Sequence, residues 1–208
     1  DFYKSDEFLS FIKHNTIEEI LTGFENYGKN LIDIKGATDL HFLENKENLT
    51  TALLFLSTQY TRTKNIKYRV NKTLRKYDLL YNAQNDNFWM FLSFVYALNI
   101  TYYLSEKFNS KIIVYNNVSE LNFITSDQPA FNSNQQNKDE NGHVTGFDLF
   151  YALNPKVAIK FVCNNGSESF EIHNVNKNEV IEINKMIFEF SYKNIFFVNE
   201  NDIINLSL

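Results

Sequence analysis

Hydrophobic residues recur every three or four positions through the first half of the chain, up to about residue 108. This spacing is typical of amphipathic helices. It predicts helices over residues 6–24, 49–81 and 86–108, with Asn48 as the capping residue of the second. The third segment is apolar on most of its circumference, so we expect it to be the central buried helix.

The second half changes to short segments rich in β-branched and aromatic residues, which are typical of strands. Asn176 stands where a helix cap is expected before residues 177–192, and a last buried strand is expected over residues 195–198. Residues 131–146 are rich in Asn, Gln, Asp and Gly and predict an exposed loop. The other predicted strands cover residues 111–115, 121–125, 147–153, 157–163 and 169–173, with a turn at Asn116 and Asn117 between the first two.

Helices followed by strands indicate an α+β fold. We predict one domain over residues 1–208, in which a mainly helical half (1–108) packs on an antiparallel sheet from the second half (109–208), with one late helix near 177–192. The chain is 44% hydrophobic and 22% charged, which excludes a disordered chain or a collagen-like repeat. A single cysteine, Cys163, excludes an internal disulfide or a multi-cysteine metal site, and its apolar neighbours predict a buried, inert thiol.

The sequence carries no signal for a membrane or for export. No run approaches the roughly 18–20 apolar residues that a membrane span needs. Residues 1–7 are polar and acidic, unlike a signal peptide, and the absence of an initiator Met suggests a processed or trimmed start. We therefore expect a cytoplasmic protein with no membrane partner.

Positive charge is concentrated in one segment of an acidic chain. The net charge is -5, yet residues 61–77 hold seven Lys and Arg residues and no acidic one, so the rest of the chain has 13 basic against 25 acidic residues. Such a segment either binds a phosphate backbone or an acidic partner, or it is a solvated outer face. On a continuous helix one stripe about 80° wide would hold Arg62, Arg69, Lys72 and Lys76.

Three tyrosines lie between these basic residues. We interpret Tyr60, Tyr68 and Tyr77 as core contacts rather than as platforms on which bases stack. Upstream of the basic residues, Gln59 and Arg62 are three positions apart, so they share one face of the predicted helix. There the guanidinium either binds a carboxylate or phosphate of a ligand, or pairs with an acidic residue of a packed helix.

A second polar cluster follows the predicted strand that ends at residue 125. Thr125, Ser126 and Asp127 come directly after apolar residues, and Pro129 fixes the exit of the chain. Asp127 is a candidate general base, metal ligand or partner of Arg62, and Ser126 is a candidate nucleophile that would need a base within reach. The alternative is a turn closed by local hydrogen bonds.

Several well-known signatures are absent. The sequence has no glycine-rich phosphate loop, no His-Glu-x-x-His and no Gly-x-Ser-x-Gly. Its four histidines do not show the spacing of metal ligands. No cofactor is predicted, apart from a divalent metal that Asp127 is able to bind.

The order of these motifs resembles a bacterial family of uncharacterised proteins, the domain-of-unknown-function family numbered 4238. The motifs are Gln-Tyr-Thr-Arg-Thr at 59–63 and Phe-Ile-Thr-Ser-Asp-Gln-Pro at 123–129, followed by Asn184. The resemblance covers residues 45–200 and implies no reaction, because the family is itself uncharacterised. Members typically begin with a His-Tyr-x-Pro segment, which is not found here, so we expect a fragment or a trimmed chain. The positions carried over are Gln59, Arg62, Thr125, Ser126, Asp127, Pro129 and Asn184.

Two hypotheses of different classes follow. In the first, the protein is a hydrolase whose substrate contains phosphate, either a small molecule or nucleic acid. Gln59 and Arg62 would hold the anionic group, and Ser126 with Asp127 would position water or a metal. In the second, a non-catalytic binding or regulatory module docks a partner on the basic stripe, and Arg62 with Asp127 locks helix to sheet. The substrate-binding candidates of the first are Thr125, Arg69, Lys72, Lys76 and Asn184.

Overall fold

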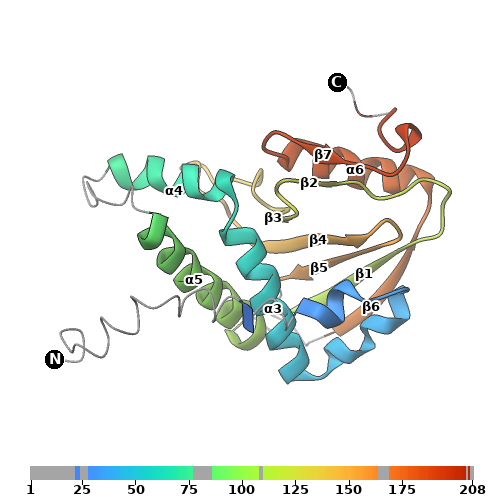
Figure 1. Cartoon of the computed structure of the whole chain (residues 1–208), viewed down its shortest axis with the longest axis horizontal. Helices are drawn as coiled ribbons and strands as arrows, with labels where there is room; N and C mark the ends of the chain where they lie inside the picture. Colours follow the sequence, from blue (N-terminus) through green and yellow to red (C-terminus); the bar gives the residue numbers. More distant parts are fainter. Residues whose placement is uncertain are drawn as a thin grey trace.

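A five-stranded sheet forms the middle layer of the protein, with helices on both of its faces (Figure 1). The computed structural model describes residues 22–23, 28–76, 86–107, 110–163, 169–204 and 206. Helix and sheet are both present, which confirms the predicted α+β class. Almost all of the helix predicted for residues 6–24, and Tyr77, lie outside the described residues.

The sheet is mixed rather than wholly antiparallel, which corrects the prediction. The strand order is β3-β4-β5-β1-β6, and its neighbours pair antiparallel except for β1 and β6, which run parallel. A parallel pair needs a long crossover, and here the chain from β1 to β6 passes through three other strands of the sheet. The strands are β1 (Lys111–Asn117), β3 (Ala130–Asn132), β4 (Asp148–Asn154), β5 (Val157–Val162) and β6 (Ser169–Val175).

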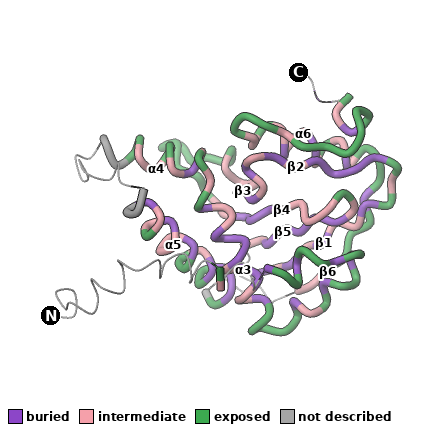
Figure 2. Tube along the Cα trace, viewed as in Figure 1, coloured by how far each residue is buried: buried purple, intermediate pink, exposed green. Residues whose placement is uncertain are grey.

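Alternate residues of the central strands belong to two separate cores. Leu149 and Ile159 pack with the N-terminal helices, whereas their neighbours Phe150 and Ala158 pack with the C-terminal helix. Successive strand residues point to opposite faces, so a strand covered on both sides is buried almost continuously. Figure 2 shows buried residues in the first part of β4 and through most of β5, while the second part of β4 is half-buried.

The long helix predicted over residues 49–81 is two helices, α3 (Lys46–Thr61) and α4 (Lys64–Lys76). The break lies at Arg62 and Thr63. The Thr63 hydroxyl accepts a hydrogen bond from the amide of Ile66 at 3.5 Å, and the Thr63 carbonyl accepts one from Lys67 at 3.1 Å. These are the contacts of a helix N-cap, so the threonine starts a new helix within a continuous apolar pattern.

The remaining N-terminal elements pack around α3. Asn45, not Asn48, is its N-cap, because the Asn45 side chain accepts hydrogen bonds from the amides of Glu47 and Asn48. The predicted helix 86–108 is α5 (Asp86–Tyr102), continued by a π-helical turn, η3 (Tyr103–Lys107), and it packs against α3. A 3-10 helix, η2 (Ala37–Glu44), contacts β1 and β6.

The other face of the sheet is covered by α6 (Lys177–Phe190), which begins at Asn176 as predicted. Beside it lies a separate pair of short antiparallel strands, β2 (Thr125–Ser126) and β7 (Ile195–Phe196). The last strand is not buried, since Phe196 is 56% and Val198 61% exposed. The loop predicted to be exposed begins in a strand, β3, whose residues are all buried. A short 3-10 helix, η4 (Glu200–Asp202), follows β7.

The strand predicted over residues 121–125 is reduced to β2, and it forms no hairpin with β1. The amide N–H groups of three consecutive residues are bonded outside any strand ladder. Asn122 donates to the Asp202 carboxylate, Phe123 to the Pro155 carbonyl and Ile124 to the Asn184 side chain. A backbone whose donors are used in this way cannot pair as a strand.

Candidate functional site

The carboxylate of Asp127 is held by the backbone of the segment that joins α6 to β7. Its Oδ1 accepts from the amide of Tyr192 at 2.9 Å, and its Oδ2 accepts from the amides of Lys193 at 3.0 Å and Asn194 at 3.2 Å. The side-chain amide of Asn194 donates to Oδ2 at 3.3 Å. Two carboxylate oxygens accept about four hydrogen bonds in total, so these donors use the acceptor capacity of Asp127.

This geometry favours a structural role for Asp127 over the catalytic alternatives. A general base or metal ligand needs a lone pair directed at the proton or the cation, whereas here backbone N–H groups face the carboxylate. All the hydrogen bonds described for the Asp127 side chain go to residues 192–194, so it is not the partner of Arg62. The carboxylate joins the β2 corner to the end of α6.

The neighbours of Asp127 complete a tight corner. The buried hydroxyl of Ser126 accepts a hydrogen bond from the amide of Gln128 at 3.1 Å, which is the local turn expected as the alternative to a nucleophile. Gln128 is also buried and donates its side-chain amide to the Ala130 carbonyl at 2.8 Å. Thr125 lies apart from these bonds, at the edge of the apolar cavity described below.

Asn184 lies inside the protein and joins three segments. Its Oδ1 accepts from the amide of Ile124 at 3.1 Å, and its Nδ2 donates to the carbonyls of Asn122 at 2.9 Å and Asp202 at 3.2 Å. The side chain is 1% exposed. A buried amide with these partners stabilises the packing of α6 on the 121–124 segment and η4, and it is remote from solvent.

Gln59 and Arg62 lie at the C-terminal end of α3. Gln59 is half-buried in the last turn, and Arg62 is the C-cap residue with an exposed side chain. Because the helix ends here, Arg62 does not continue onto the basic stripe of α4, contrary to the prediction from one continuous helix. Arg69, Lys72 and Lys76 remain within about 60° of one another on α4.

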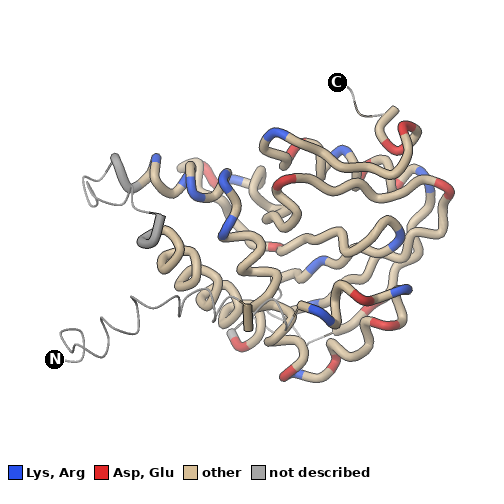
Figure 3. Tube along the Cα trace, viewed as in Figure 1, with Lys and Arg blue, Asp and Glu red and all other residues tan. Residues whose placement is uncertain are grey.

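The basic helix α4 exposes three of its cationic side chains to solvent. Its sequence contains six Lys and Arg residues and no acidic one, and Figure 3 shows basic positions following one another along it. Lys64, Arg69 and Lys72 are exposed, and the described residues include no ion-pair partner for them. Tyr68 is 58% exposed on the same helix, so it is not the core contact that we predicted.

A groove of about 550 Å³ lies between α3, α4 and α5. Arg69 belongs both to its wall and to the cationic side of α4. In one wall of the groove, the rings of Tyr60 and Phe147 meet edge to face with centroids 5.7 Å apart. The residues around the groove are Tyr60, Thr61, Ile66, Arg69, Val70, Thr73, Tyr96, Asn99, Ile100, Tyr103 and Phe147.

The phenol of Tyr60 lies in this wall, where the pKa of the group is shifted upwards. Burial raises the pKa of Tyr60, and the positive charge of Arg69 partly offsets that effect. The hydroxyl therefore remains a hydrogen-bond donor throughout the neutral pH range. An aromatic wall, a neutral phenol and a guanidinium at one rim suit a ligand that combines a flat ring with negative charge.

A second cavity, of about 650 Å³, shares Ile100, Tyr103 and Phe147 with the groove and reaches Cys163. Cys163 is half-buried, and its amide donates to the Asp148 carboxylate at 3.2 Å. Burial, and then the negative charge of Asp148, raise the pKa of the Cys163 thiol. The thiol therefore stays protonated at neutral pH, and it is half-buried rather than buried as the sequence predicted.

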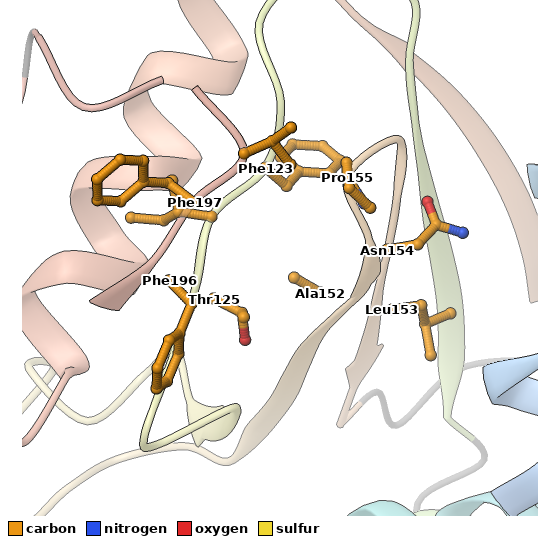
Figure 4. A pocket seen from close by; sticks show the side chains of 10 residues that line it. Phe123, Thr125, Ala152, Leu153, Asn154, Pro155, Phe196 and Phe197 are labelled. Carbon is orange, nitrogen blue, oxygen red and sulfur yellow. The ribbon is translucent and has the colours of Figure 1, made fainter. Parts of the chain in front are cut away.

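A third cavity, of about 350 Å³, lies between the β2–β7 pair and the hairpin of β4 and β5 (Figure 4). Thr125 is at its edge, and Phe123, Pro155, Phe196 and Phe197 are among the apolar residues around it (Figure 4). None of the side chains around it is titratable, so it offers no acid, base or anion-binding group for chemistry.

Metal-ligand clusters and membrane-spanning helices are both absent from the part of the chain that is described. No group of three or more His, Cys, Asp and Glu side chains there is placed to hold a metal ion. None of the described helices has the length and apolar character that crossing a membrane requires.

The groove residues were missed by the sequence analysis, apart from Arg69. Tyr60, Tyr96, Tyr103 and Phe147 come from segments far apart in the sequence and look like ordinary core aromatics. The one available signal was the occurrence of tyrosines beside the basic residues of α4, which we interpreted as core. Their grouping depends on how α3, α4 and α5 pack.

A protein-family model covers almost the whole chain. The model of the family described as a protein of unknown function, DUF4238, matches residues 1–201. The chain belongs to this family. The expected membership in DUF4238 is thereby confirmed, and the match extends beyond the predicted 45–200. Neither the search of curated proteins nor that of solved structures found a match.

Proposed function

We propose that this protein is a non-catalytic binding module that binds nucleic acid on the exposed cationic side of α4. The observation that carries the proposal is uncompensated positive charge in an acidic chain. Lys64, Arg69 and Lys72 are exposed and have no ion pair among the described residues. Arg69 and Lys72 are three residues apart, so their Cβ atoms lie about 5–6 Å from each other on one face of α4, where successive phosphates can contact them.

Several lysines elsewhere in the protein behave differently. Four surface lysines each have a carboxylate oxygen 2.8 Å away. Their charge is neutralised within the fold, so they add little positive potential in comparison with the lysines of α4. The pairs are Lys46 with Glu106, Lys111 with Glu171, Lys177 with Glu120 and Lys185 with Glu182.

Tyr68 favours nucleic acid over an acidic protein as the partner. An exposed tyrosine among lysines and arginines is a surface on which a base can stack, and base stacking adds to phosphate contacts in single-strand binding. The hydrolase hypothesis has less support, because Asp127 is engaged by backbone amides.

Charge reversal on α4 tests the proposal. The double variant Arg69→Glu/Lys72→Glu should weaken binding of a labelled 20-nucleotide strand at least about tenfold at low salt, because two phosphate contacts become repulsive. Fluorescence anisotropy over a salt series measures this. The slope of log affinity against log salt should also fall by about 0.7 for each phosphate that the variant no longer neutralises.

The matched control is Lys177→Glu/Lys185→Glu on α6, which changes the net charge by the same amount. Its binding should stay within about twofold of the unchanged protein. Equal losses in both double variants would show that only net charge matters, and the proposal would be wrong. Absence of binding by the unchanged protein at low salt would also contradict it.

A further inference from the structure

The groove adjoins the cationic side of α4. The aromatic wall of the groove therefore lies next to the positive charges of that helix. Arg69 lies in both, and Ile66, Val70 and Thr73 of the same helix line the groove. A polyanion bound along the cationic side of α4 would therefore lie beside the groove. Whatever flat, apolar group the polyanion carries is within reach of the wall that Tyr60 and Phe147 form.

The size and chemistry of the groove suit a nucleic-acid base. Its volume of about 550 Å³ is within the range typical of sites that enclose small organic groups. Tyr60, Tyr96, Tyr103 and Phe147 offer ring faces and edges, and every base has a face that stacks on such rings. Asn99 donates its side-chain amide to the Val95 carbonyl at 3.0 Å, which leaves its Oδ1 as an acceptor for the edge of a base.

We propose that the groove takes an unpaired base of a single-stranded nucleic acid whose phosphates lie on the cationic side of α4. This inference rests on the proposed function and narrows it from nucleic acid in general to single strands. In a duplex the bases are stacked and paired, so bringing one into the groove would first require it to be flipped out. A single strand avoids most of that cost.

Nucleic-acid strands with and without bases separate the contribution of the phosphates to binding from the contribution of the bases. A 20-nucleotide strand should bind at least about tenfold more tightly than a strand of the same phosphate number that carries abasic sites, and than the matching duplex. A 2-aminopurine at the centre of the strand should lose fluorescence on binding as it stacks. DNA and RNA strands are compared in parallel, and preference for either over its abasic form supports the proposal.

Two neighbouring tyrosines supply a matched pair of variants. Tyr103 lines the groove and Tyr102 does not, although both are exposed and their rings are 6.0 Å apart. Tyr103→Ala should lower the preference for the strand with bases several-fold and leave binding of the abasic strand unchanged. Tyr102→Ala should change neither quantity. An effect of Tyr102→Ala as large as that of Tyr103→Ala would overturn the assignment.

The outcomes also separate this inference from the proposed function. If the abasic strand or the duplex binds as tightly as the single strand, and all three depend on salt, the base site is wrong and phosphate binding by α4 stands. If no strand binds at low salt, the proposed function fails and the base site fails with it. Circular dichroism of each variant shows whether it is folded before binding is measured.

Discussion

Replacing Asn184 with alanine should lower the free energy of unfolding by about 3 kcal/mol, measured by urea denaturation. The substitution removes one acceptor and two donors from a buried position, and it leaves the Ile124 amide and the carbonyls of Asn122 and Asp202 without these partners. Each unsatisfied buried polar group costs about 1–3 kcal/mol, partly relieved where another partner remains. This is the largest single effect that we expect.

Asn178→Ala is the matched control for Asn184. Asn178 lies on the same helix with an exposed side chain, so its loss should change the free energy of unfolding by no more than about 0.5 kcal/mol. The alternative, in which Asn184 binds substrate, predicts the reverse pattern. Normal stability together with weaker ligand binding in Asn184→Ala would contradict the structural role.

Replacing Asp127 with alanine should cost about 2 kcal/mol of folding stability, because three consecutive backbone amides lose a charged acceptor. Hydrogen exchange should show the consequence locally. The amides of Tyr192, Lys193 and Asn194 should exchange faster, since the carboxylate that they bond is gone. The folding stability of Asp127→Asn should lie between that of Asp127→Ala and that of the unchanged protein, because the asparagine oxygen can accept some of the same hydrogen bonds.

Asp33→Ala controls for the loss of a negative charge. Asp33 is exposed, and the described residues give its carboxylate no hydrogen-bond partner, so its removal should leave the stability and the exchange of residues 192–194 unchanged. A folded, fully stable Asp127→Ala variant with normal exchange would instead make Asp127 a catalytic candidate again. That result would revive the hydrolase hypothesis.

Together the two substitutions decide between the original hypotheses. Asp127 was chosen because a polar side chain at the end of an apolar strand can mark a site, whereas Asn184 was carried over from the family resemblance. In the structure each one accepts hydrogen bonds from the backbone of a distant segment. A polar residue at the end of an apolar strand is expected both where it makes a tertiary contact and where it belongs to a catalytic site. The sequence pattern around Asp127 therefore did not distinguish these two roles.

Several local features were predicted correctly because their causes are local, although the caps at Asn45 and Thr63 were missed. The Asn176 cap is made by bonds that span only three residues, from Asn176 to Asn178 and Glu179. The periods of the apolar residues likewise predicted α5, α6 and four strands of the sheet, β1, β4, β5 and β6. The resemblance to the family rested on two short motifs, and the family match confirmed it.

Two larger errors arose where distant segments compete for the same backbone groups. The sequence from 121 to 125 has the composition of a strand, yet its amides bond to Pro155, Asn184 and Asp202. The parallel pairing of β1 with β6 likewise joins strands between which β2, β3, β4 and β5 intervene along the chain. Neither arrangement follows from the period of the apolar residues, because each depends on partners far away in the chain.

The sequence by itself determined the class of the fold, the positions of most helices and strands, and the concentration of positive charge between residues 61 and 77. Only the tertiary structure decided that this charge faces solvent beside an aromatic groove, and that Asp127 and Asn184 bond to backbone inside the fold. The physical reason is that composition and period fix what each segment can bury, whereas the partner of each polar group depends on which segments pack together.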